Sequence, residues 1–421
     1  MPDCGLNSIL PVLWPRAAEG ILRRFLKPPK LWPSHSAAER RVTWMELFFD
    51  LIFVAAVAQV GVPLQAEFDW WGLLRYCFLF SLIWSAWSGH TLFATRFDND
   101  DTFQRLANLV QCFIAAVMAA NAKDALDSRS SAGFGAAYAC MRLVLVAQYL
   151  RVSRIPETRT LTLRSALGIG VAACIWIASA LAPLPFRYFL WIVGLLADRA
   201  TTLWSTKKGF EFPPHASHFP ERLGVFTIIL LGEFVAAVMR GIESQEDWTV
   251  AAAVSAFASL SFAFVVWWWY FDLDGGAAER RLRSRRDKSL FRVWTLAHPP
   301  LFLGIGVASA GFERLISMGG LGMLPSPGAR IACLASASIV AALITIGCTT
   351  AWGIEGLWRS LFPHLFLLGV LVVIAFFAQT ITSVWLVLAL LAMTLAGALV
   401  TWQTRTSESV AGHDGEQATK G

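Results

Sequence analysis

The fold of this protein is decided by residues 42–61, which read VTWMELFFDLIFVAAVAQVG. An α-helix needs about 20 mainly apolar residues to cross the hydrocarbon layer of a membrane. This stretch has that length, and its charged side chains are Glu46 and Asp50, both near its start. It therefore predicts a transmembrane helix that carries two carboxylates.

Stretches of this kind recur along the whole chain. Of 421 residues, 56% are hydrophobic and 15% are charged, which excludes a soluble fold because too little polar surface remains to cover the apolar side chains. We predict an all-α fold, a polytopic transmembrane helical bundle of about 12 spans. The expected domains are a basic cytoplasmic tail at 1–41, the transmembrane domain at 42–402 and a disordered cytoplasmic tail at 403–421.

The predicted spans are the apolar stretches at 43–62, 70–94, 105–122, 133–150, 165–182, 184–203, 222–240, 249–271, 292–312, 329–350, 361–378 and 382–402. The stretches at 184–203 and 361–378 have the weakest pattern, so ten or eleven crossings are the alternative. Trp267–Tyr270, at the end of one span, is expected to form part of an interfacial aromatic belt.

Lys and Arg collect in alternate connections, which is the pattern of cytoplasmic loops. They occur in the N-terminal tail and after the fourth, sixth and eighth spans, whereas the other connections are short or acidic. We therefore expect a multi-pass protein of the cytoplasmic (inner) membrane with both termini in the cytoplasm. The net charge of +6 reports this topology, and no nucleic-acid partner is expected. The seven cysteines form no CxxC pair, so no metal site and no cofactor are expected.

One fragment, FVAAV, occurs twice, at 53–57 and at 234–238. Each copy follows an acidic residue, Glu46 or Glu221, but the two separations differ by six residues. A duplication of half the chain, as in many transporters, is one explanation. Chance recurrence in helices rich in alanine and valine is the other.

Ionisable residues inside the predicted spans are the candidates for function, because a charge in hydrocarbon costs about 2.5–3.5 kcal/mol. Glu46 and Asp50 are four residues apart and share one helical face. Together they can hold a proton or a cation. The structural alternative is that Glu46 lies at the interface and that Asp50 pairs with a buried arginine to lock two helices together.

Two further spans carry charges. Glu221 and Arg222 begin the span that holds Glu233 eleven residues later, near the expected midplane. Arg142 lies mid-span and needs an acidic partner, for which Asp50 or Glu233 is the natural choice. For Glu233, binding of an ion and a structural pair with Arg142 are both open.

Two histidines and one loop complete the candidates. His90 and His298 can tune proton movement, or each can be a hydrogen-bonded packing residue. We expect Glu46, Asp50, His90, Arg142, Glu233 and His298 to line one polar cavity. The loop at 95–101 reads TRFDNDD, and its Arg96, Asp98, Asp100 and Asp101 are expected to cap helices and form a loop salt bridge.

Several of these segments together resemble the bacterial low temperature requirement protein A family. They are residues 42–54, the loop at 95–101, the run from Glu221 to Glu233, the WWYFD segment at 268–272 and the HPPL segment at 298–301. The resemblance implies a multi-span inner-membrane protein whose name comes from a growth requirement in the cold. It supplies no activity, substrate or catalytic residue.

The density of charge inside the spans favours a secondary transporter or ion-permeation protein for a small ion or small molecule. In that hypothesis Asp50 and Glu233 bind the proton or cation, Arg142 is the counter-charge, and His90 or His298 tunes protonation. One alternative is a membrane-embedded enzyme that acts on a lipid or quinone, with the same carboxylates as general acid and base. The other is a non-catalytic membrane sensor or assembly factor.

Overall fold

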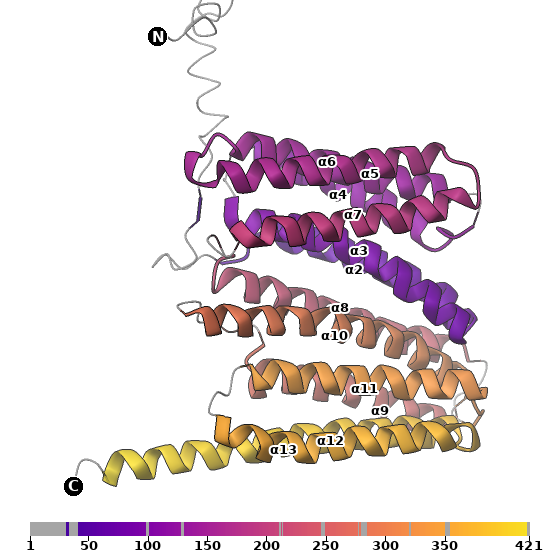
Figure 1. Cartoon of the computed structure of the whole chain (residues 1–421). Coiled ribbons are helices and arrows are strands. Elements are labelled where there is room, and N and C mark those ends of the chain that lie inside the picture. The colour runs from indigo at the N-terminus through magenta and orange to yellow at the C-terminus, as the bar shows by residue number, and fades with distance from the viewer. Residues whose placement is uncertain are drawn as a thin grey trace, which may run out of the picture.

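Long α-helices run side by side in this computed structural model (Figure 1). The structure describes residues 31–32, 41–97, 101–127, 130–209, 212, 214–245, 249–276, 278, 284–319, 321–349 and 354–418. Within these residues the α-helices are α2 (Trp44–Ala66), α3 (Trp70–Phe97), α4 (Thr102–Ala122), α5 (Ser131–Val152), α6 (Arg159–Leu181), α7 (Phe186–Gly209), α8 (His218–Glu243), α9 (Val250–Trp268), α10 (Arg285–Ser317), α11 (Ser326–Cys348), α12 (Ile354–Phe377) and α13 (Ser383–Ala418). Shorter helical turns are η2 (Pro156–Thr158), η3 (Trp269–Leu273) and η4 (Ala378–Thr380).

Each predicted span corresponds to one of these helices, and no strand occurs in the described residues. Ten helical segments are long and apolar enough to cross a membrane by length and composition. The remaining two helices are α7 and α12, which hold the stretches with the weakest pattern in the sequence. The all-α polytopic bundle is therefore confirmed, and the chain is a multi-pass membrane protein.

Side chains cap the helices that lead to the charged sites. Thr43 accepts a hydrogen bond from the backbone of Glu46, whose carboxylate accepts one from the backbone of Thr43 in return. Ser284 and Asp287 form the same reciprocal pair at the start of α10. Such a capping box satisfies two of the backbone donors that every helix start leaves open. Its presence fixes where α2 and α10 begin.

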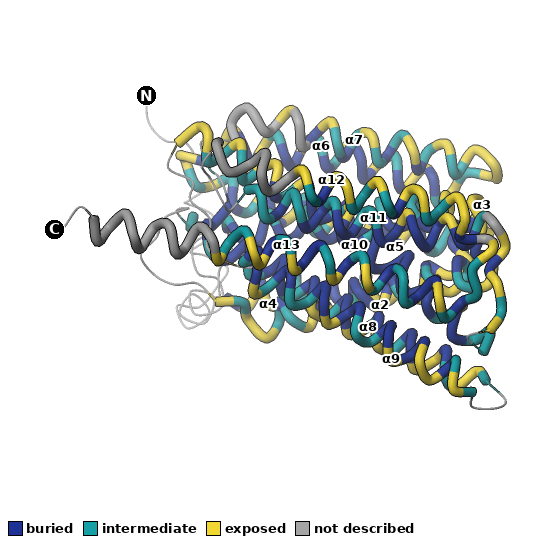
Figure 2. Tube along the Cα trace, turned by 90° about the horizontal axis from the view of Figure 1, so that it is seen from below, coloured by how far each residue is buried: buried dark blue, intermediate teal, exposed yellow. Residues whose placement is uncertain are grey.

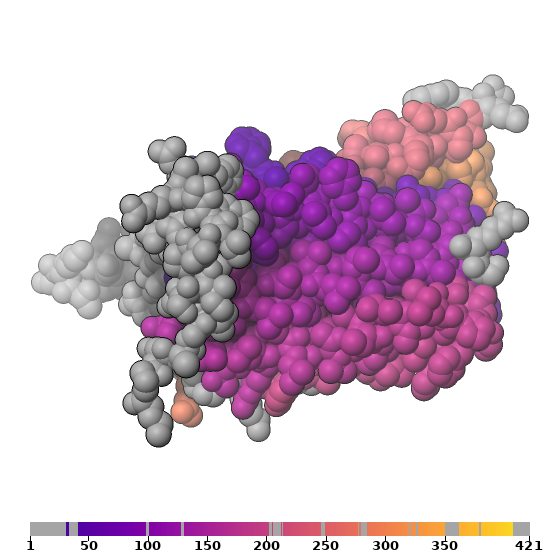
Figure 3. Space-filling view, turned by 90° about the horizontal axis from the view of Figure 1, so that it is seen from above, coloured from indigo at the N-terminus to yellow at the C-terminus, as the bar shows by residue number. Residues whose placement is uncertain are grey.

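Part of the order of helix packing is the same in the two halves of the chain. In the first half α2 packs on α4, α4 on α5, α5 on α6, and α6 on α7. In the second half α8 packs on α10, α10 on α11, α11 on α12, and α12 on α13. Other contacts differ between the halves: α9 packs closely on α13, whereas α3 makes few contacts with α7. The first half makes up most of the face in Figure 3, and the two halves meet where α2 contacts α8 and α10.

Apolar side chains occur on the outside of the bundle as well as in its interior. Figure 2 shows exposed positions along the helices beside buried ones. Phe113, Phe264 and Phe366 are each more than 60% exposed. In water such a surface would associate, whereas lipid tails solvate it. By contrast, Trp269 and Tyr270 are fully buried, so the aromatic-belt interpretation of Trp267–Tyr270 is wrong for these two residues. They belong to the π-helical turn η3, which turns their side chains into the core.

The C-terminal segment differs from the expected disordered tail. The structure continues α13 as one helix through Ala418. The apolar part of α13 nucleates the helix, and no proline interrupts residues 403–418, so the helix continues although Gly412 and Gly415 each cost about 1 kcal/mol. The α13 helix extends beyond the other helices in Figure 1.

Candidate functional site

The two carboxylates of α2 meet an arginine at the start of α8. Arg222 donates from Nε to Asp50 Oδ2 at 3.0 Å and from Nη2 to Asp50 Oδ1 at 2.5 Å. Its Nη1 lies 3.0 Å from Oε1 of Glu46. All three side chains are 3% exposed or less. Arg222 is thus the buried arginine that pairs with Asp50 and holds α2 and α8 together.

A histidine and a tryptophan complete this group, which we call the charge cluster: Glu46, Asp50, Trp87, His218 and Arg222. His218 Nε2 lies 3.2 Å from Glu46 Oε2, and Trp87 Nε1 donates to Asp50 Oδ1 at 2.7 Å. Among these five side chains, two carboxylates face one guanidinium, and His218 lies where it can share a proton with Glu46. A proton on His218 or Glu46 reduces the negative charge of these side chains, which low-dielectric surroundings favour.

The backbone next to the charge cluster is held by Glu221, a carboxylate in the first turn of α8. Glu221 Oε2 accepts a hydrogen bond at 3.1 Å from the backbone N–H of Val42, just before α2. His218 and Arg222 are four residues apart and lie on one face of α8, which is the spacing that brings both to Glu46. The starts of α2 and α8 therefore lie at the same end of the bundle. We call this end the basic face, after the basic residues Arg151, Arg154, Arg159, Arg164, Arg285, Arg286 and Lys288 in its loops and helix ends.

His90 flanks the cluster. It is 1% exposed, and its ring centroid lies 4.3 Å from that of Phe49. Nδ1 of His90 has no hydrogen-bond partner among the described residues. His90 thus packs on the helix face that carries Glu46 and Asp50.

Aromatic rings form a layer next to the cluster. Trp84, Trp87, Phe226 and Phe302, from α3, α8 and α10, make up this aromatic layer. The ring centroids of Trp87 and Phe226 are 4.8 Å apart, and those of Phe226 and Phe302 are 4.9 Å apart. Phe226 is one turn beyond Arg222 along α8, so the layer separates the cluster from the rest of that helix.

A cavity of about 150 Å³ lies on the far side of this layer, between α2, α3, α8 and α10. Arg240 in it bridges two carboxylates, at 2.9 Å from Glu233 and 3.0 Å from Glu313. Their side chains are 45%, 23% and 16% exposed, respectively, so the cavity opens outward. Two carboxylates against one guanidinium again leave one negative charge. This cavity, which we call the outer cavity, therefore favours a cation.

A tyrosine hydroxyl is available to a ligand in the outer cavity. Tyr76 lines it and is 1% exposed, and its hydroxyl has no hydrogen-bond partner in the described part of the chain. A Cβ on Gly306 would lie 1.9 Å from that hydroxyl, so only glycine permits this position of Tyr76. Gln65 and Ser309 add further polar side chains to the lining. An unpaired buried hydroxyl costs free energy unless something binds it.

Arg142 has a partner that the sequence analysis did not name. Its Nη2 lies 3.0 Å from Asp198 Oδ2, in a buried group that also contains Tyr138 and Ser85. The expectation that Asp50 or Glu233 pairs with Arg142 is wrong, because Asp50 binds Arg222 and Glu233 binds Arg240. The Arg142 group joins α3, α5 and α7.

His298 also lies apart from the charge cluster. Its Nε2 is 3.0 Å from the hydroxyl of Tyr270, and its Nδ1 is 2.8 Å from the carbonyl oxygen of Trp294. Both ring nitrogens are thus engaged in the core. The six candidates do not line one cavity: of them, Glu233 is the residue that lines the outer cavity in the described structure.

The loop at 95–101 is described at its two ends. Arg96 donates from Nε to the carbonyl oxygen of Phe212 at 2.9 Å. Asp101 caps α4 through the backbone N–H of Gln104 and pairs with Arg151, as the capping and salt-bridge interpretation predicts. Asp98 and Asp100 lie outside the described residues.

Sequence reasoning missed His218, Asp198, Arg240, Glu313 and Tyr76. His218 could have been predicted from the sequence, because it lies four residues before Arg222 and so on the same helical face. Asp198 carries the same signal as Glu233, an acidic residue well inside a span, but its span is weakly apolar. Arg240 and Glu313 lie near helix ends, where charged residues are common. Tyr76 carries no sequence signal, because nothing in the sequence shows that its hydroxyl is buried without a partner.

Two comparisons place the chain among known proteins. The family model described as bacterial low temperature requirement A protein matches residues 41–398. An uncharacterized protein of Rhizobium meliloti (strain 1021) is 25% identical over 285 residues, which are 65% of this chain and 69% of the relative. The range matched by the family model covers both the charge cluster and the outer cavity.

Proposed function

This chain belongs to the bacterial low temperature requirement A protein family. The name of the family refers to growth in the cold and states no biochemical activity, so we propose a function from the site itself. The protein moves a proton or a small cation across the membrane, along the interface of α2 with α8. This transport supports growth at low temperature. The path joins the outer cavity to the charge cluster.

One observation carries the proposal: two charged compartments lie on the same pair of helices, with an aromatic layer between them. Glu46 and Asp50 of α2 face Arg222 of α8 on one side, and Gly61 and Gln65 of α2 face Glu233 of α8 on the other. Each compartment holds one carboxylate more than it has arginines. A positive charge thus has a binding position on each side of a closed barrier, which is what stepwise transport requires.

Each step of the proposed transport can be assigned to particular residues. A cation that enters the outer cavity competes with Arg240 for Glu233 and Glu313, and the Tyr76 hydroxyl can contribute a ligand oxygen. Passage inward requires the aromatic layer to move. Trp87 belongs to the layer and donates to Asp50, so protonation of the cluster and movement of the layer are linked. A proton on His218 or Glu46 reduces the negative charge of the cluster.

The distribution of arginine gives the orientation. We propose that the basic face lies in the cytoplasm, that both termini lie there, and that the membrane is the inner membrane. In this orientation the outer cavity opens away from the cytoplasm, because Glu233, Arg240 and Glu313 lie toward the other ends of α8 and α10.

The direct test is flux through the purified protein in liposomes. Internal pH and cation content are followed under imposed proton, sodium and potassium gradients, with the membrane potential clamped by an ionophore. We expect an ion-selective flux that empty liposomes lack and that saturates with cation concentration. A correctly folded protein that moves none of these ions under any gradient would contradict the proposal.

A further inference from the structure

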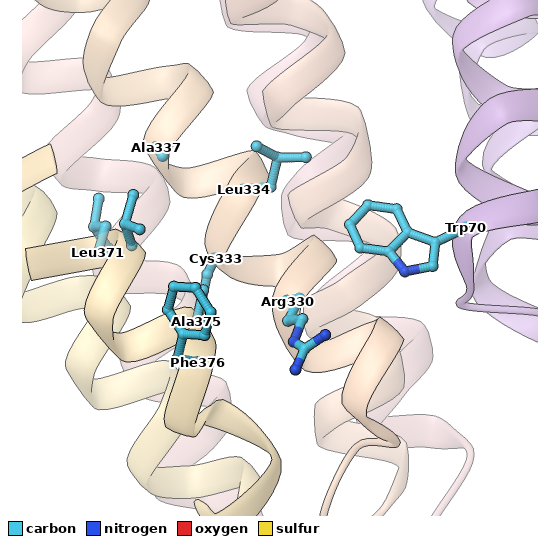
Figure 4. Close-up of a pocket in the computed structure, with 9 residues that line it drawn as sticks. Trp70, Arg330, Cys333, Leu334, Ala337, Leu371, Ala375 and Phe376 are labelled. Carbon is cyan, nitrogen blue, oxygen red and sulfur yellow. The ribbon is translucent and has the colours of Figure 1, made fainter. Parts of the chain in front are cut away.

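A second cavity, of about 300 Å³, lies between α11 and α12. Arg330 of α11 and Trp70 of α3 stand at one side of it, and Leu371 and Phe376 of α12 stand at the other (Figure 4). Arg330 lies near the start of α11, Trp70 begins α3 and Phe376 lies at the end of α12. All three are therefore at the end of the bundle opposite the basic face.

The walls of this cavity continue into the lipid-facing surface. Leu334, Val372 and Phe376 line it and are 52%, 55% and 65% exposed. Apolar side chains that are exposed along a membrane span contact acyl chains. The cavity therefore opens sideways into the hydrocarbon layer and not into a water-filled path.

Arg330 is the charged residue of the lining, and it has no ion pair within the described part of the chain. Its guanidinium is exposed at a helix start, where the headgroup region of the bilayer begins. Guanidinium forms paired hydrogen bonds with phosphate, and tryptophan is typical of the same depth in the membrane. The site thus combines an apolar slot with an anion contact at its outer end.

We propose that this slot binds one phospholipid of the leaflet opposite the basic face, with an acyl chain between α11 and α12 and its phosphate on Arg330. A second copy of this chain fits poorly, because an α-helix with its side chains is about 10–12 Å across and the slot is too small for one. The proposal is independent of ion transport, since none of these residues belongs to the charge cluster or the outer cavity.

The test is lipid binding to purified, delipidated protein, measured by native mass spectrometry. Two probes with the same acyl chains are added in turn: phosphatidylglycerol, and the diacylglycerol that lacks the phosphate. We expect one retained phosphatidylglycerol per protein and little diacylglycerol. Arg330→Gln weakens retention at least about tenfold, since a charge-assisted hydrogen bond contributes about 1.5–3 kcal/mol.

Two further variants separate the outcomes, and thermal unfolding confirms that each variant is folded. Arg314→Gln removes another exposed arginine at the same end of the bundle, outside the slot, and retains the lipid as the wild type does. Ala337→Phe fills the slot and loses the lipid although Arg330 is intact. Equal retention of both probes, or wild-type retention by Arg330→Gln, would overturn the proposal. So would dimers that Ala337→Phe converts to monomers, because the occupant is then a second copy of this chain.

Discussion

Arg222 of α8 and Asp50 of α2 are joined by two hydrogen bonds, of 3.0 and 2.5 Å, and neither side chain is exposed to any extent. The pair fixes the contact between the two halves of the chain at the basic face. Glu46 lies beside the pair, 3.0 Å from Arg222 Nη1 and 3.2 Å from His218 Nε2. The stability of the bundle and the charge of the candidate site therefore depend on the same atoms.

Removal of one partner of this pair destabilises the protein. Asp50→Asn weakens the two hydrogen bonds from Arg222 while Glu46 stays beside the guanidinium, so we expect a loss of about 1.5–3 kcal/mol in the free energy of unfolding. Denaturant unfolding in detergent measures it. The double variant Asp50→Leu with Arg222→Met removes both charges and regains part of the loss. A double variant that is no more stable than Asp50→Asn would contradict this account.

The Arg142 group is expected to be structural. Asp198→Asn leaves a buried arginine without its carboxylate, so it also costs about 3–5 kcal/mol of stability. Because no member of this group belongs to the charge cluster, the aromatic layer or the outer cavity, the flux per folded molecule stays at the wild-type value. The measurement is the ion flux divided by the amount of folded, monodisperse protein in the preparation. A selective loss of flux in well-folded Asp198→Asn would move Arg142 into the pathway.

Two glycines give opposite results when a methyl group is added. Gly306→Ala places a Cβ on the hydroxyl of Tyr76, so the tyrosine has to move out of the outer cavity, at a cost of about 1–3 kcal/mol. Gly232→Ala meets no atom within 4 Å and gains up to about 1 kcal/mol of helix stability. Unfolding temperatures of the two variants test this difference. Similar effects of both substitutions would mean that Tyr76 is not held against Gly306.

The aromatic layer is expected to act as a barrier. Phe226→Ala removes the ring between Trp87 and Phe302, so protons leak faster at an imposed pH gradient, although stability falls by about 3–5 kcal/mol. Phe226→Leu keeps most of the volume and leaks less. Rates are compared at a temperature where both variants are folded. A leak that does not rise in Phe226→Ala would place the barrier elsewhere.

The helices of this fold are readable from sequence because each span has to satisfy its own backbone hydrogen bonds in lipid. Length and apolar composition therefore located twelve helices, of which ten segments are long and apolar enough to cross a membrane, and the i, i+4 spacing placed Glu46 and Asp50 on one face. The sequence did not show which acidic residue pairs with which arginine. Arg142 pairs with Asp198 and not with Asp50, because side chains of α5 meet side chains of α7, whereas Asp50 of α2 meets Arg222 of α8.

The outer cavity was predicted only through Glu233. Its other charges, Arg240 and Glu313, lie 73 residues apart and meet only because α8 packs on α10. The hydroxyl of Tyr76 is significant because it is buried without a partner, which is a property of packing. Residues of these kinds become candidates once helix contacts are known.

The measurement that tests the central claim most directly compares ion flux through Glu233→Gln with flux through Glu243→Gln in the same liposome preparation. Both substitutions remove one negative charge from α8, but Glu243 is exposed at the helix end, outside the outer cavity, whereas Glu233 lines it. We expect Glu233→Gln to abolish saturable flux while Glu243→Gln keeps it, at equal abundance and unfolding temperature. Wild-type flux through folded Glu233→Gln would contradict transport through this cavity.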